Sequence, residues 1–62
     1  MTVELLTVQE TAEILRVHRR TVERLIEQRR LRPLKVGRRT LITSRELEAY
    51  VAHQEKEGRR VA

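Results

Sequence analysis

Arginine is the residue type with the clearest chemical use in this chain. Several arginines stand in one segment, and the apolar residues between them recur at helical spacing. The segment is VHRRTVERLIEQRR, residues 17–30. A guanidinium group presents its N–H donors as a planar fork, which matches the oxygens of a phosphate or the O6 and N7 atoms of guanine. These arginines either solvate the surface of a helix or bind an anion of that kind.

The apolar residues between the arginines predict an amphipathic helix from about Arg19 to Gln28. At about 100° per residue, one stripe carries Val22, Leu25 and Ile26. The other side carries Arg20, Thr21, Glu23, Arg24 and Glu27. Because the apolar stripe must pack against the rest of the chain, the polar side is free to meet a partner. Pairing of the arginines with the two glutamates remains the alternative.

A capping box predicts a helix before this one. Thr7 and Glu10 stand three residues apart, where a hydroxyl caps the helix and a carboxylate reaches back to the cap. Apolar residues then recur at helical spacing, so we expect a helix over residues 8–15. The connection 16–18 leaves room only for a tight turn between packed helices. His18 then stands at the N-cap of the second helix, where it and the free N–H groups can meet a phosphate.

Two short β-prone runs about a glycine predict a β-hairpin after the second helix. The runs are Arg32–Val36 and Thr40–Ile42, and Gly37 supplies the turn. Lysine and arginine cluster at the tip, at Lys35, Arg38 and Arg39. A charged turn is commonly only solvated. Two basic elements in direct succession nevertheless favour one shared anion-binding surface.

The C-terminal part predicts a third helix that begins after a cap at Thr43 or Ser44 and ends near His53. The fold class is therefore mainly α with a small β-hairpin. The remaining core candidates are Leu5, Leu6, Leu31, Leu34, Val36, Leu41, Leu47 and, at the core edge, Tyr50. Residues 54–62 are polar and include a glycine. We expect one domain over residues 1–53 and a flexible charged tail over residues 54–62.

Composition narrows the class of partner. The chain has 62 residues and a formal net charge of +5, from 14 Lys and Arg against 9 Asp and Glu. This excess favours a polyanion. The single aromatic residue, Tyr50, argues against modules that stack the bases of RNA or single strands. Duplex DNA is the expected partner.

Other classes of function find little support in the sequence. The chain has no cysteine, and its two histidines, His18 and His53, lack the spacing of a catalytic triad or a zinc motif. We therefore expect no enzyme, no metal site and no cofactor. No apolar stretch approaches the roughly 20 residues of a membrane span, and the N-terminus lacks a signal-peptide pattern. We expect a cytoplasmic protein with no membrane partner.

Four segments together resemble the excisionase-family, MerR-like winged helix-turn-helix domain. They are LLTVQETAEIL, VHRRTVERLIEQRRL, PLKVGRRTLI and TSRELEAYV, and the resemblance runs from about Leu6 to Val51. It implies that the second helix enters the major groove of DNA and that the hairpin is a wing at the adjacent minor groove. The implied contacts of the helix are Arg19, Arg20, Thr21 and Arg24. The implied contacts of the wing are Lys35, Gly37, Arg38 and Arg39.

The resemblance also implies a role. Excisionases are architectural proteins that bind and bend attachment-site DNA and direct excision of a phage or integrative element by an integrase. The expected partners are duplex DNA, an integrase-class recombinase and further copies of the chain on DNA. The expected place is the nucleoid, in the cytoplasm of a bacterial cell or phage-infected host. A small single-domain transcriptional regulator of the same fold is the main alternative, and a protein-interaction module with an incidental basic face is the second.

Overall fold

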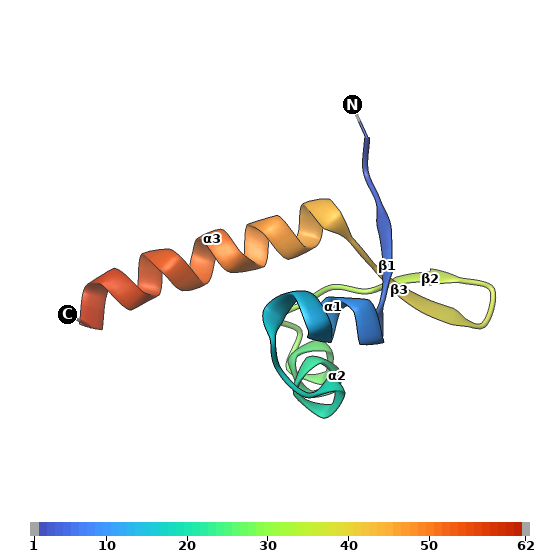
Figure 1. The fold of residues 1–62 in the computed structure, drawn as a ribbon, viewed down its shortest axis with the longest axis horizontal. Helices are drawn as coiled ribbons and strands as arrows, with labels where there is room; N and C mark the ends of the chain where they lie inside the picture. Colours follow the sequence, from blue (N-terminus) through green and yellow to red (C-terminus); the bar gives the residue numbers. More distant parts are fainter. Residues whose placement is uncertain (1, 62) are drawn as a thin grey trace.

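The structure, a computed structural model, describes residues 2–61, with the side chains of residues 2–58. The elements in chain order are β1 (Leu5–Thr7), α1 (Val8–Leu15), α2 (Arg19–Glu27), β2 (Leu34–Val36), β3 (Arg39–Thr43) and α3 (Ser44–Val61). The β2–β3 hairpin and α3 extend in opposite directions from the region where α1 meets the sheet (Figure 1). The expectation of a mainly α fold with a small hairpin is confirmed.

The start and end of α1 follow from local hydrogen bonds. Thr7 Oγ1 accepts from the amide of Glu10 at 3.0 Å, and Glu10 Oε1 accepts from the amide of Thr7 at 2.9 Å, so the predicted capping box is present. The helix ends at Arg16, which adopts the left-handed conformation with φ 59° and ψ 44°. The amides of Arg16 and Val17 donate to the carbonyls of Glu13 and Ala12. This closure turns the chain into α2.

A third strand, β1, was not predicted. The sheet is antiparallel in the order β1-β3-β2, and Leu6 of β1 lies opposite Ile42 of β3. β1 has only three residues, too few to show a period of two, and its last residue is also the cap of α1. Residues 5–7 form a strand because they pair with β3. Their own sequence does not predict this pairing.

Burial varies within the sheet, and the central strand β3 is the most buried strand. Ile42 is fully buried, whereas Leu5, Leu34 and Val36 are 52%, 43% and 47% exposed. The register places all three of these on the face opposite to Ile42, a face that also carries the buried Leu41 opposite Leu34. The prediction that Leu5, Leu34 and Val36 belong to the core is wrong, because they stand on the two edge strands, whereas Leu41 on the central strand is buried on the same face.

The main core joins the three helices. It consists of Ala12, Val22, Leu25 and Leu31, with Val8, Leu15, Ile26 and Tyr50 packed against it. The apolar stripe predicted for the second helix therefore faces α1, and the prediction of Tyr50 at the core edge is confirmed. Leu41 and Leu47 are also buried, as predicted.

The third helix is longer than predicted. Thr43 Oγ1 caps it by accepting from the amide of Glu46 at 3.0 Å, but the helix continues past His53 to Val61. Gln, Glu and Lys after His53 are good helix formers, and Gly58 in the last turn costs at most about 1 kcal/mol. Within the described part, no helix combines the length and the apolar character that crossing a membrane requires.

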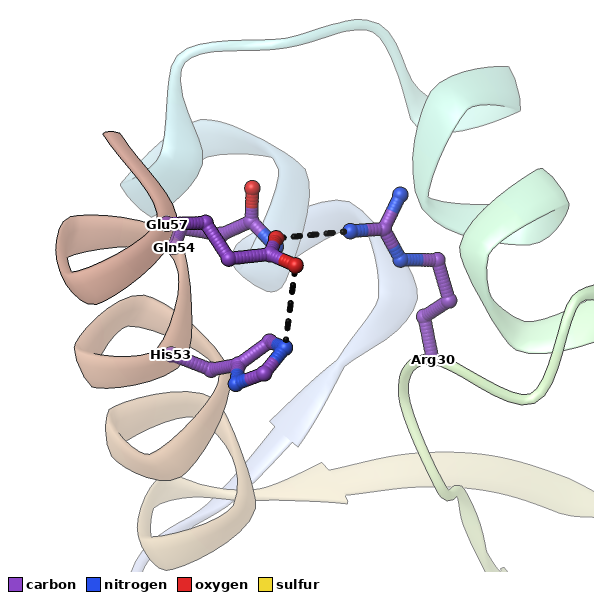
Figure 2. A network of polar contacts seen from close by, with 4 residues as sticks. All are labelled: Arg30, His53, Gln54 and Glu57. Atoms are coloured by element: carbon purple, nitrogen blue, oxygen red, sulfur yellow. Dashed lines mark hydrogen bonds and ion pairs between the residues drawn. The ribbon is translucent and has the colours of Figure 1, made fainter. Parts of the chain in front are cut away.

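A small polar network ties the outer half of α3 to the loop after α2. Glu57 lies 3.4 Å from Nε2 of His53 and 3.7 Å from a guanidinium nitrogen of Arg30 (Figure 2). Gln54 Nε2 donates to the same carboxylate at 3.5 Å. These contacts favour the helical conformation past the predicted end at His53. The flexibility proposed for residues 54–62 stays a prediction.

Candidate nucleic-acid interface

The packing of α2 on α1 decides which of its side chains face outward. Val22 and Leu25 are buried between the two helices. Arg20 and Arg24 lie on the opposite side of α2 and are exposed. Among residues 2–58, no carboxylate lies within ion-pair distance of either one. Both guanidinium groups are therefore available to an external anion.

Arg19 differs from these two arginines. Its Nε lies 3.3 Å from Oε2 of Glu23 one turn along, with the side chains 61% and 52% exposed. Such an exposed pair contributes little to stability, about 0.3–0.5 kcal/mol. The alternative that the arginines only pair with glutamates thus holds for Arg19 but not for the other two.

The N-terminus of α2 is open. His18 is the N-cap residue and is exposed, and its side chain makes no capping hydrogen bond. Its carbonyl accepts from the amides of Thr21 and Val22, so the helix begins with its first N–H groups directed outward. An anion at this end would meet those donors and the positive end of the helix dipole. Thr21 is half-buried, the least exposed of the candidate residues on α2.

The hairpin has the geometry of a short basic wing. Gly37 adopts φ +60° in the turn, a conformation that residues with a side chain rarely take. Lys35 Nζ donates to Thr40 Oγ1 across the strands at 3.0 Å, on the same face as Ile42 and therefore toward the helices. Arg38 lies at the tip and Arg39 begins β3, and both are exposed.

Two surface grooves join α2 to the wing. In the first, of about 290 Å³, Arg19 lines one side and Arg38 and Arg39 line the other. In the second, of about 350 Å³, Arg19, Glu23 and Glu27 lie across from Lys35. The tertiary structure therefore brings the start of α2 and the wing to one side of the molecule, as a joint surface requires.

Two acidic residues of this surface were not among the site residues predicted from the sequence. Glu23 and Glu27 line the groove toward the wing and also a groove of about 320 Å³ along the outer face of α2, shared with Arg20 and Arg24. Their spacing of four residues from Arg19 and from each other placed them on the polar side of the helix, which was the available signal. The surface is therefore basic at both ends with carboxylates between.

The family assignment rests on the same elements. The sequence model of the helix-turn-helix domain matches residues 5–55, so the chain belongs to this family. With α1 and α2 as the helix-turn-helix and β2–β3 as the wing, the fold is a winged helix-turn-helix, a DNA-binding class of domain. No match was found among curated proteins or among solved structures.

Proposed function

We propose that this protein binds duplex DNA at specific sequences, with α2 in the major groove and the wing against the adjacent backbone and minor groove. The observation that carries the proposal is the groove that Arg19 of α2 lines together with Arg38 and Arg39 of the wing. A duplex lying across that side meets both basic elements at once. Phosphate contacts from the wing set the register, and side chains of α2 contact base edges.

Each candidate residue has a role in this arrangement. His18 and the open N-terminus of α2 bind a phosphate, and Thr21 adds a hydroxyl contact at the edge of the helix. Arg20 and Arg24, which have no ion pair within residues 2–58, enter the major groove of the DNA. The usual specific contact of arginine there is a bidentate one to guanine. Lys35, Gly37, Arg38 and Arg39 form the wing contact, in which the glycine lets the backbone approach the duplex.

We further propose that the biological role is that of an excisionase. The support is the resemblance of the four segments quoted above, together with membership of the helix-turn-helix domain family. Copies bound along attachment-site DNA bend it, at a cost of a few kcal/mol offset by added protein contacts. The proposed place of action is the nucleoid of a bacterial cell or phage-infected host, and the proposed partners are neighbouring copies and an integrase-class recombinase.

Residues 55–62 are the proposed contact to a recombinase or to a neighbouring copy. The segment is charged, and residues 55–61 form the outer end of α3 (Figure 1). Deletion of residues 55–62 should leave binding to one isolated site unchanged and weaken excision. Excision at the full rate by the shortened protein would contradict the contact.

The proposed function is tested by gel-shift titration of a labelled attachment-site fragment at two salt concentrations, with excess unrelated duplex as competitor. Discrete, stepwise complexes that survive the competitor are expected. A smear lost equally to any competitor and steeply to salt would show phosphate attraction alone and would contradict the proposal. Specific complexes on a promoter and none on the attachment fragment would contradict only the excisionase role.

A charge-reversal pair tests the binding face itself. Arg20→Glu with Arg38→Glu should abolish duplex binding, because each removes a cation and places an anion against the phosphates. The matched control is Arg45→Glu with Lys56→Glu, which makes the same charge change at exposed positions of α3. Equal loss of binding in both double variants would mean that net charge matters and that the proposed face does not.

A further inference from the structure

The outer face of α2 holds a carboxylate where a surface for a polyanion would be expected to carry none. Glu23 lies between the arginines of this face and lines both the groove toward the wing and the groove along the helix. Its side chain is 52% exposed, so it is not a core residue. Near phosphates such a charge is unfavourable by electrostatic repulsion, unless it meets a hydrogen-bond donor there.

One ion pair favours a particular orientation of Glu23. Arg19 binds Oε2 through Nε at 3.3 Å, which holds the carboxylate against the first turn of α2. Within residues 2–58, Oε1 has no hydrogen-bond partner. The two terminal nitrogens of Arg19 are not part of this pair, so the same arginine can also bind a phosphate. Glu23 is thus an oriented acceptor with one free oxygen.

The major groove offers few partners to such an acceptor. Its donors are the N4 amino group of cytosine and the N6 amino group of adenine, whereas guanine and thymine present acceptors. Adenine carries the acceptor N7 beside N6, and N7 repels the second oxygen of a carboxylate. Cytosine carries no acceptor beside N4 on its own edge, so it is the base that fits Glu23 best.

We infer that Glu23 is a specificity-determining residue that accepts a hydrogen bond from N4 of a cytosine, with Arg19 as the residue that positions it. This inference rests on the proposed binding of duplex DNA through α2. Arg20 and Arg24, on the same face, attract any duplex through its phosphates or select guanine. Glu23 repels the phosphates and selects a cytosine, so it contributes discrimination and lowers the affinity for unrelated DNA.

The test is selection of binding sites from a pool of random duplexes by the full chain, its Glu23→Ala and Glu23→Gln variants, and Glu48→Ala. Glu48 is exposed on α3, so its replacement makes the same charge change away from the proposed face. The wild type and Glu48→Ala should select the same sites, including one cytosine preferred about tenfold over the other bases. Glu23→Ala should lose the preference at that position alone and bind unrelated duplex more tightly.

The glutamine variant separates base recognition from a merely structural role. A glutamine amide both donates and accepts, which matches N7 and N6 of adenine, so Glu23→Gln should change the selected cytosine to adenine. A role confined to the ion pair with Arg19 predicts no change in the selected base for either variant. An unchanged consensus would overturn the inference and leave the proposed function standing. A wild type that selects no consensus would overturn both.

Discussion

At the scale of single residues, Thr11 is a buried polar side chain with an unmet hydrogen bond. It is fully buried in α1, and its hydroxyl has no partner among the described residues. A buried hydroxyl without a partner costs about 1–3 kcal/mol by mutational measures. Thr11 lies three residues after Val8 and four before Leu15, so helical spacing places it on the apolar stripe of α1.

Replacing Thr11 by valine should stabilise the protein. Valine keeps the shape of threonine and removes the unpaired hydroxyl, so the free energy of unfolding should rise by about 1 kcal/mol. Urea unfolding followed by circular dichroism measures the change. Thr11→Ser, which keeps the hydroxyl and loses the methyl group, is the control and should destabilise. A loss of stability in Thr11→Val would mean that the hydroxyl is satisfied in solution.

Arg16 and Gly37 illustrate how differently two left-handed positions appear in a sequence. Gly37 has φ +60° and was expected in a turn because glycine favours it. Arg16 has φ 59° although it is not a glycine. Its conformation follows from the packing of α2 on α1, which requires the chain to reverse within three residues. Only the conformation of Gly37 could be inferred from residue type.

At the scale of elements, α1 and α2 were predictable because their signals are local. A capping box and a stripe repeating every three to four residues depend on neighbours along the chain. β1 and the end of α3 were not predictable in this way. β1 exists through its pairing with β3, and α3 passes His53 with the help of Glu57, which meets Arg30 from another part of the chain.

The network of Figure 2 gives a prediction at this scale. Glu57→Gln removes the charge that attracts Arg30 and His53, whose contacts are 3.7 and 3.4 Å long and partly exposed. Exposed pairs contribute up to about 1 kcal/mol, so global stability should change little. Amide hydrogen exchange after His53 should become faster, because the outer half of α3 loses its tie to the α2 loop.

Glu55→Gln is the control for the loss of charge. Glu55 is exposed on the same helix, and the structure gives it no ion pair within residues 2–58. Its replacement should leave the exchange of these amides unchanged. Equal acceleration in both variants would show that the tie through Arg30 does not hold the helix.

At the scale of the whole molecule, stability depends more on the core between the helices than on the exposed residues of the edge strands. Leu25→Ala opens a cavity between α1 and α2 and should cost about 2–5 kcal/mol, comparable to the entire stability of a domain of this size. Leu34→Ala removes an equal volume from a side chain that is 43% exposed and should cost less than about 1 kcal/mol. Thermal unfolding of both variants measures the contrast.

Comparing Leu25→Ala with Leu34→Ala also separates loss of DNA binding by unfolding from loss of a DNA contact. Loss of DNA binding in Leu25→Ala would report unfolding, whereas Leu34→Ala should fold and bind as the wild type does. If Leu34→Ala unfolded like Leu25→Ala, the outer face of the sheet would have to be covered in solution.

The sequence by itself determined the charge, the three helix starts, the hairpin turn and the identity of the basic residues, because these depend on residue type and on spacings of a few positions. The tertiary structure alone decided which face of the sheet is covered, that a third strand forms and that α3 extends to Val61. It also decided that Arg19 lines a groove together with Arg38 and Arg39 of the wing. These features arise from contacts between segments distant in the chain, whose free energy no local pattern records.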